Sequence, residues 1–390
     1  MKTVFQVMGL VAVLMSVGYT DEVEDYLQVL KNDGQEPALF VREQLQHHDL
    51  VVLDDGLHAA VEPFEFCMDY LRQYPESVDM IFLEVIPITA QTAIDSFLQS
   101  AVKDSMLLAP VFQQDFRFGW PYETYLNLFS EVWDINHTTD ATIRIVGVNQ
   151  PIYWHGLHNR EDYNQFQKSL VARDYFMYQI IFRYMDEFES EKKGLFMTNT
   201  RHAYKCIRDS GGDVYWNTGT FFHQWHPGKT YSIRFHNMSL HVKAQKQRVE
   251  NATTEGMERM VYEWIRLDDG RWDQAFERFS NRPVAVPFKG NCFGETPYTG
   301  NHSADVLPGQ TQFDAYDALI FLKPLEETRF SAHTKFYYSE EFKEELEHRV
   351  RVMHGHELND FLHRNEAASI TDYVEKLSES VPESPNPLVK

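Results

Sequence analysis

Two short apolar runs in the first quarter of the chain end abruptly in polar residues. The run 51–53 (Val-Val-Leu) leads into Asp54, Asp55 and His58, and the run 80–83 (Met-Ile-Phe-Leu) leads into Glu84. Short and almost wholly apolar runs are typical of parallel strands that are buried on both faces, and open α/β sheets bind their ligands at the carboxyl ends of such strands. The pattern therefore predicts a sheet edge that carries acid, base or metal-binding side chains.

The composition predicts a globular core and argues against a polyanionic partner. The chain has 390 residues, of which 43% are hydrophobic, and this is enough for one large domain or two ordinary ones. Its formal net charge is -22, whereas nucleic-acid binding needs clustered Lys and Arg. We therefore expect a small-molecule substrate and no nucleic-acid partner, while the oligomeric state stays open.

The first twenty residues have the pattern of a secretory signal peptide. Lys2 gives a positive start, residues 4–17 are almost unbroken apolar sequence, and Gly18 and Thr20 are small residues before a cleavage point at Asp21. The apolar run is shorter than the ~20 residues that span a bilayer, and no later segment approaches that length. We expect a secreted or periplasmic protein without a membrane span after signal cleavage; the alternatives are an uncleaved anchor or a buried N-terminal helix.

Strand-like and helix-like segments alternate along the rest of the chain. This alternation predicts an α/β fold, with a mostly parallel central sheet flanked by helices on both faces and with helical additions. The expected strands are 50–53, 80–85, 143–148, 195–198, 231–235 and 318–322. The expected helices are 60–73, 90–105, 164–191, 201–209, 255–268, 340–352 and 357–376. We expect a signal peptide at 1–20, a single domain at 21–377 and a disordered, proline-containing tail at 378–390.

His58 and Asp55 form the first candidate pair. They are three residues apart where the chain leaves a strand, and a carboxylate at that distance can fix the tautomer of an imidazole or position a water molecule. The alternative is structural, because Asp54 or Asp55 could cap the helix that is expected to begin near residue 60.

Glu84, Arg173 and His202 extend this candidate site. Glu84 ends a run too apolar for a solvated strand, so its carboxylate is expected to be paired or to have a raised pKa. Arg173 could pair with Glu84 or hold a substrate anion, or could simply be a solvated neighbour of Asp174. His202 follows the expected strand 195–198 and would place a second imidazole at the same edge of the sheet.

Six segments resemble motifs of the erythromycin esterase-like proteins and occur in the same order. Residues 52–58 (Val-Leu-Asp-Asp-Gly-Leu-His) are similar to the "LGE-x-x-H" opening of that family, and residues 81–84 to its second strand, which ends in Glu. Residues 143–149 are similar to its "GxD" strand, and residues 173–177 to its "RDxxM" helix. Residues 195–203 are similar to its "HNxH" strand end, and residues 313–321 to its "yDAliF" strand. It is the order and strand context of these short motifs that support the resemblance.

The resemblance implies an α/β fold shared with ChaN-like haem-uptake proteins and Tiki-type proteases. It also implies metal-independent hydrolysis of an ester-like bond, with His58 as the general base that activates water. Asp55 would orient His58 or hold the water, and Glu84 and His202 would complete the catalytic group. The substrate-binding residues would be Arg173, Asn149 and Asn199.

Three positions depart from the family motifs. The Gly-Glu pair is replaced by Asp54 and Asp55, the strand-end Asp by Asn149, and the first His of the paired-His motif by Asn199. Asp55 keeps the charge but is one methylene shorter, and the two asparagines cannot act as bases. We therefore expect an ester-like substrate other than a macrolide.

Three further hypotheses stay open beside a hydrolase without a cofactor. A ChaN-like protein would bind haem or another iron ligand through an axial His or Tyr. A metal-dependent hydrolase would bind a divalent metal through Asp55, His58, Glu84 and His202. A catalytically degenerate member would keep the fold as an interaction module.

Overall fold

The structure, a computed structural model, describes residues 23–115, 117–246, 258–299 and 306–389. The expected signal peptide at 1–20 lies outside the described residues, and so does Lys390 at the end of the expected tail. In the part of the chain that is described, no helix has the length and apolar character needed to cross a membrane.

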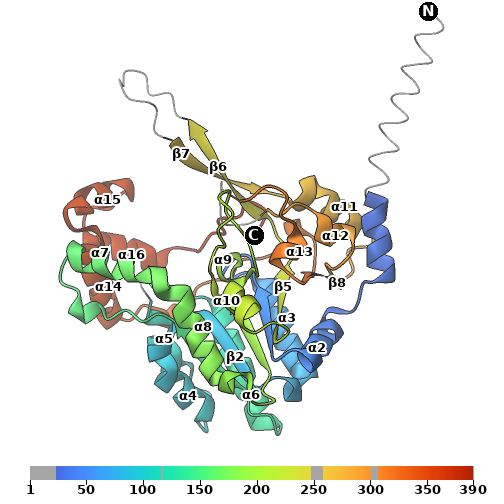
Figure 1. The fold of residues 1–390 in the computed structure, drawn as a ribbon. Helices are drawn as coiled ribbons and strands as arrows, with labels where there is room; N and C mark the ends of the chain where they lie inside the picture. Colours follow the sequence, from blue (N-terminus) through green and yellow to red (C-terminus); the bar gives the residue numbers. More distant parts are fainter. Residues whose placement is uncertain (1–22, 116, 247–257, 300–305, 390) are drawn as a thin grey trace, which may run out of the picture.

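Within the described residues, seven strands form one sheet and two form a separate ribbon. The sheet has the order β3-β2-β4-β1-β5-β9-β8, in which β8 pairs antiparallel with β9 and the other neighbours are parallel. β6 and β7 form the antiparallel ribbon, which projects from the body in Figure 1. The strands are β1 (Leu50–Asp54), β2 (Met80–Pro87), β3 (Arg144–Asn149), β4 (Gly194–Thr198), β5 (Thr230–Phe235), β6 (Ser239–Lys246), β7 (Glu258–Ile265), β8 (Val284–Pro287) and β9 (Ala318–Phe321).

Helices cover both faces of the sheet, which confirms the expected α/β class (Figure 1). Residues 23–32 are helical as well. The α-helices that follow are α2 (Pro37–His47), α3 (Val61–Gln73), α4 (Gln91–Gln99), α5 (Ala109–Gln113), α6 (Glu123–Thr138), α7 (Arg160–Ser169), α8 (Arg173–Tyr184), α9 (Thr200–Ala203), α10 (Thr218–Trp225), α11 (Arg271–Arg278), α12 (Cys292–Glu295), α13 (Gln312–Ala315), α14 (Glu340–His354), α15 (Leu358–Arg364) and α16 (Ile370–Glu379).

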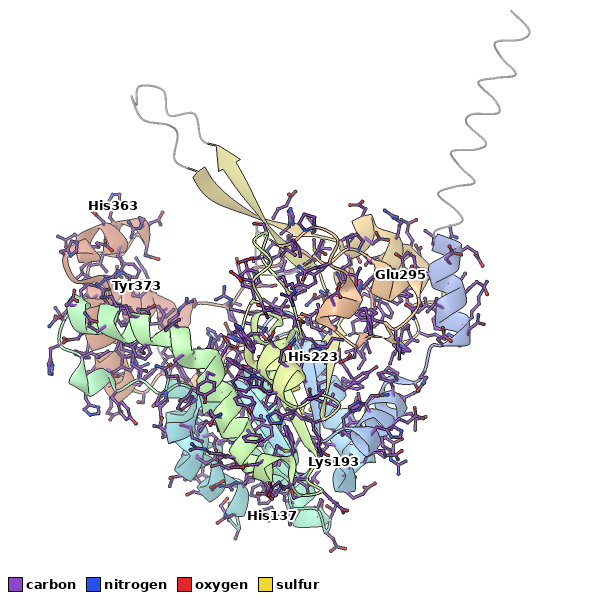
Figure 2. The ribbon with its side chains drawn as sticks, in the orientation of Figure 1. His137, Lys193, His223, Glu295, His363 and Tyr373 are labelled. Carbon is purple, nitrogen blue, oxygen red and sulfur yellow. The ribbon has the colours of Figure 1, made fainter. Side chains whose placement is uncertain are left out.

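The strands carry apolar side chains on both faces because each face is packed against helices. Along β1, Val51 and Leu53 join the core cluster that contains residues of α3, α4 and α6. Leu50 and Val52 point the other way and join the cluster that contains residues of α8 and α11. Successive side chains of a strand alternate between faces, so a strand buried on both sides is apolar throughout. Side chains fill the space between the layers in Figure 2.

Five of the expected helices differ from the structure. The expected helix 90–105 ends at Gln99, and the expected helix 357–376 is broken at residues 365–369, between α15 and α16. The expected helix 255–268 is wrong, because its described part contains the strand β7, which pairs with β6. The expected helix 201–209 ends at Ala203, where the chain becomes extended and buries Tyr204 and Ile207. The expected helix 164–191 is interrupted by a 3₁₀ turn at Leu170–Ala172, because α7 and α8 pack against different core clusters.

The order of the strands determines where the candidate residues meet. β2, β4 and β1 are neighbours and parallel, with Leu83 beside Met197 and Asp54 beside Thr198 in the register. Their carboxyl ends therefore lie at one edge of the sheet, where α/β folds place their ligands.

Candidate active site

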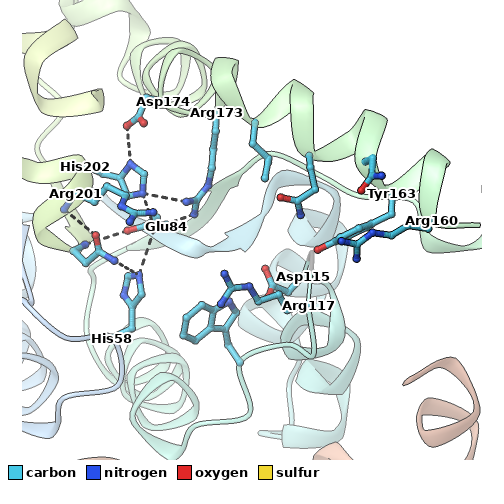
Figure 3. Close-up of a pocket in the computed structure, with 15 residues that line it drawn as sticks. His58, Glu84, Asp115, Arg117, Arg160, Tyr163, Arg173, Asp174, Arg201 and His202 are labelled. Atoms are coloured by element: carbon cyan, nitrogen blue, oxygen red, sulfur yellow. Dashed lines mark hydrogen bonds and ion pairs between the residues drawn. The ribbon is translucent and has the colours of Figure 1, made fainter. Parts of the chain in front are cut away.

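The seven residues that the sequence singled out lie together at this edge (Figure 3). The segment after β1 supplies Asp55 and His58, and β2 supplies Glu84. Asn149 is the last residue of β3, and Arg173 is the first residue of α8. Asn199 is the N-cap of α9, and His202 lies within that helix. The structure thus brings together side chains that are up to 147 positions apart in the chain, from Asp55 to His202.

Asp55 holds one ring nitrogen of His58 and does not cap a helix. Asp55 Oδ2 lies 3.2 Å from His58 Nδ1, and the Asp55 side chain is 2% exposed. The N-cap of α3 is Ala60, which makes no side-chain cap hydrogen bond. The alternative that an aspartate caps this helix is therefore wrong. The turn between the two residues uses Gly56 at φ +67°, where a Cβ would collide with Asn237.

Asp174 holds His202 in the same way, and this partner was not identified from the sequence. Asp174 Oδ1 lies 2.7 Å from His202 Nδ1 and also accepts hydrogen bonds from the backbone N–H and the hydroxyl of Thr218. The site therefore contains two Asp–His pairs, each with the carboxylate on Nδ1 and with Nε2 turned inward.

Glu84 lies between the two imidazoles. Its Oε1 is 3.4 Å from His58 Nε2 and 3.2 Å from His202 Nε2. Arg173 Nη2 donates to the same oxygen at 2.9 Å. The other oxygen, Oε2, accepts hydrogen bonds from the Thr198 hydroxyl at 2.5 Å and the Asn199 backbone N–H at 3.0 Å. Arg173 is therefore paired with Glu84, one of the two roles expected for a buried guanidinium, and is not a solvated charge.

The two asparagines fix the orientation of their neighbours. Arg173 Nε donates to Asn149 Oδ1 at 2.8 Å, so Asn149 orients the guanidinium. The side-chain nitrogen Nδ2 of Asn199 is 2.9 Å from Nε2 of His58. Its Oδ1 accepts from the backbone N–H of Arg201, which assigns Nδ2 as the atom that donates to the imidazole.

Charges within the cluster shift the pKa values of its acids and bases. Burial opposes ionisation of Glu84, but the imidazoles of His202 and His58 hold its pKa well below the usual range. Burial would lower the pKa of His58, but the carboxylates of Glu84 and Asp55 outweigh this and raise it to about 10. Burial raises the pKa of Asp55 to about 6, although His58 acts in the opposite direction.

His202 responds to its surroundings in a similar way. Burial favours its neutral form, yet Asp174 and Glu84 raise its pKa, while Arg173 acts against them. Glu84 therefore remains ionised, and both imidazoles stabilise its negative charge.

The cluster opens into a cavity of about 750 Å³. Its inner end is formed by His58, Glu84, Asn199 and His202, and Trp120 packs its indole edge-on against His58 at 5.0 Å between ring centroids. The outer part is lined by residues of α7 and of the loop before α6, none of which the sequence predicted. These residues are Asp115, Arg117, Trp120, Arg160, Tyr163, Asn164 and Gln167.

The cluster does not fit a divalent metal or a haem iron well. Arg173 places a guanidinium 3.1 Å from His202 Nε2 and 2.9 Å from Glu84, at the position where a bound cation would lie. Each Nε2 atom already has two hydrogen-bonding neighbours, Glu84 and Arg173 for His202, and Glu84 and Asn199 for His58, whereas a metal ligand needs a free lone pair. Among the described residues, no group of three His, Cys, Asp or Glu side chains has the geometry of a metal site.

Comparison with known proteins gives likeness at the level of the fold. No protein-family model matches the sequence, and no curated protein matches it. A succinoglycan biosynthesis protein of known structure superposes with a TM-score of 0.52 at 8% identity, over 80% of this chain and 98% of that chain. A protein from Bacillus cereus superposes with a TM-score of 0.50 at 12% identity, over 77% of this chain and 97% of that chain.

A third solved structure is the erythromycin esterase EreC, a variant in its open conformation. It superposes with a TM-score of 0.48 at 10% identity, over 73% of this chain and 93% of that chain. The first two solved structures share the α/β fold that the sequence predicts. At these identities the likeness concerns the fold alone.

Proposed function

We propose that the protein hydrolyses an ester-like bond of a small molecule in the cavity at the carboxyl edge of the sheet. The observation that carries the proposal is the convergence of two Asp–His pairs on Glu84 and Arg173 beside a cavity of about 750 Å³. Paired acids and bases with shifted pKa values, gathered in one cavity, are typical of catalytic sites.

His58 is the general base in this proposal. In its neutral form Asp55 holds the proton on Nδ1, which leaves the Nε2 lone pair directed toward Asn199 and the cavity. A water molecule that replaces the Asn199 contact gives its proton to Nε2 while its oxygen attacks the ester carbonyl carbon. The imidazolium then returns this proton to the leaving-group oxygen as the tetrahedral intermediate collapses.

Arg173 and His202 stabilise the oxyanion that forms on the carbonyl oxygen. Both are held rigidly, Arg173 by Asn149 and Glu84 and His202 by Asp174. Donors that are fixed before the reaction stabilise developing charge without reorganisation. Asp55 and Glu84 act on the imidazoles as orienting and charge-balancing groups.

The test is the turnover of 4-nitrophenyl acetate by the wild-type protein and by His58→Ala. We expect turnover above the buffer rate for the wild type and a loss of roughly 100-fold or more in kcat/KM for the variant, as is usual for a general base. His363→Ala, which alters an exposed histidine of α15 (Figure 2), is the matched control and should retain full activity. Equal turnover by the wild type and His58→Ala would rule out this mechanism.

Export to the periplasm or the medium is part of the proposal and rests on the composition of residues 1–20. Expression of the full chain in a secreting host should give an exported product that begins at Asp21. Mass spectrometry of that product measures its N-terminus, and retention of the first twenty residues on a cell-associated product would contradict export.

A further inference from the structure

The candidate active-site cavity has a charge opposite to that of the whole chain. The chain has 58 acidic and 36 basic residues, Asp and Glu against Lys and Arg. Of the described residues that line the cavity, four are arginines, namely Arg117, Arg160, Arg173 and Arg201. Two histidines add to them, against three carboxylates. Because acidic residues outnumber basic ones in the chain, its overall composition does not explain why four arginines line one cavity.

The acidic groups of the lining are already engaged or buried. Glu84 accepts hydrogen bonds from Arg173, Thr198 and Asn199. Asp174 accepts from His202 and Thr218. Asp115 is 3% exposed. The carboxylates of Glu84 and Asp174 are therefore paired with groups at the inner end of the cavity.

Three of the four arginines keep their capacity to bind an anion. Arg117 and Arg201 are exposed, and neither forms an ion pair within residues 23–115, 117–246, 258–299 and 306–389. Arg160 lies over the Tyr163 ring and is 3.8 Å from Glu357, whose side chain is 52% exposed. That contact is longer than a hydrogen bond, and an exposed pair of this kind contributes little.

Two of the four arginines, Arg117 and Arg160, lie away from the two imidazoles. In Figure 3, His58 and His202 lie at one end of the cavity and Arg160 lies with Tyr163 at the other, while Arg117 lies between them beside Asp115. One ligand can therefore contact both ends. A guanidinium binds carboxylate and phosphate oxygens through two parallel N–H donors, and a cleft with low-dielectric walls concentrates such anions.

We propose that the substrate carries a carboxylate or phosphate group, which Arg117 and Arg160 hold while the ester-like bond lies against His58. This inference rests on the proposed function for the position of the reacting bond, but the anion-binding end can be measured without turnover. Binding and turnover are therefore tested separately.

The binding experiment uses calorimetric titration of the full-length protein at pH 7.5 with adipate, with its uncharged diamide adipamide, and with inorganic phosphate. We expect adipate or phosphate to bind at least tenfold more tightly than adipamide. Arg117→Gln and Arg160→Gln should each weaken anion binding by tenfold or more, whereas Arg282→Gln, an exposed arginine outside the cavity lining, should not. Because Arg117 is exposed, its variant tests the proposal even if Arg160→Gln does not fold. Anion binding no tighter than adipamide binding, or equal in Arg117→Gln and the wild type, overturns the proposal.

The turnover experiment compares mono-4-nitrophenyl adipate with its methyl ester, which lacks the charge. We expect the charged ester to have at least a tenfold higher kcat/KM than the methyl ester, and Arg117→Gln to lower this ratio at least tenfold. Turnover of both esters at equal kcat/KM overturns the anionic substrate and leaves the hydrolase standing. Tight binding of adipate without turnover of either ester would support the anion-binding site and contradict the proposed hydrolase activity.

Discussion

His58 is subject to two opposing influences, and its protonation state decides whether it can act as a base. The carboxylates of Glu84 and Asp55 favour the imidazolium, whereas the amide of Asn199 donates to Nε2 and favours the neutral ring. The carboxylate charges are the larger effect, because the imidazolium compensates their negative charge inside a buried cluster.

The pH dependence of the rate follows from this balance. With a pKa of about 10, His58 is mostly protonated at neutral pH, and the fraction of free base grows as the pH rises. We therefore predict that kcat/KM, corrected for hydroxide, increases by about tenfold per pH unit from pH 7 to 9 and levels off near pH 10. A rate that falls over this range would show that the protonated imidazole is the active form and that His58 acts as an acid.

Sequence reasoning found the site residues that lie at or shortly after the end of an apolar run. Glu84 was recognisable because an apolar run ends directly before it, and His58 because it comes shortly after another such run; the order of the strands then brings them together. Asp174 could not be assigned to His202, because the two residues are 28 positions apart and their contact depends on how α8 packs. Arg117 is in a loop without a periodic pattern. Arg160 begins α7, and its signal was visible as the N-cap Asn159 followed by Glu161 and Asp162.

At the level of elements, the end of β1 is anchored by a buried carboxylate. Asp54, which is 1% exposed, accepts hydrogen bonds from Tyr316 at 2.6 Å, from Thr200 at 3.1 Å and from the backbone N–H of Gly56 at 2.8 Å. These contacts join the segment that carries Asp55 and His58 to α9 and to the end of α13. The segment that carries Asp55 and His58 is thus fixed by contacts on the side away from the cavity.

Removing the Tyr316 hydroxyl should destabilise the fold measurably. We predict that Tyr316→Phe lowers the free energy of unfolding by about 1.5–3 kcal/mol, the usual contribution of a hydrogen bond to a charged group. Urea denaturation measures this change. Tyr298→Phe is the matched control, because the buried Tyr298 hydroxyl has no hydrogen-bond partner among the described residues. A loss of stability no larger than that of the control would mean that this contact does not hold β1.

Strands were predicted more accurately than helices, for a physical reason. A strand buried on both faces is apolar at every position, and this is visible in a window of a few residues. β7 was mistaken for a helix because its identity depends on pairing with β6, which no local pattern reveals. The segment 164–191 was expected to be one helix because both of its halves are amphipathic. Each half, however, packs against a different core cluster.

At the scale of the whole molecule, the C-terminal helices support the loop that lines the cavity. Arg349 of α14 is 4% exposed, and its Nη1 donates to the backbone carbonyls of Gln113 and Arg117. Tyr373 of α16, labelled in Figure 2, packs on Phe118 with 6.0 Å between ring centroids. The C-terminal quarter of the chain therefore positions residues that contact the substrate in our proposal.

Loss of the Arg349 contacts should loosen this loop and leave the sheet intact. We predict that Arg349→Ala increases amide hydrogen exchange in residues 117–122 by roughly tenfold or more, because a buried, charged donor no longer holds the carbonyls. Amides of β1 should exchange as in the wild type. Arg351→Ala, an exposed arginine on the same helix, is the control. Unchanged exchange in residues 117–122 would mean that the loop is held by other contacts.

The central claim is that the two Asp–His pairs and Glu84 act as one catalytic unit. A double-mutant cycle tests it most directly, through kcat/KM for 4-nitrophenyl acetate in His58→Ala, His202→Ala and the double variant. Residues that act as a unit give non-additive losses, so we predict that the double variant is about as slow as the slower single variant. Losses that multiply, or a single variant with the wild-type rate, would contradict a shared catalytic site.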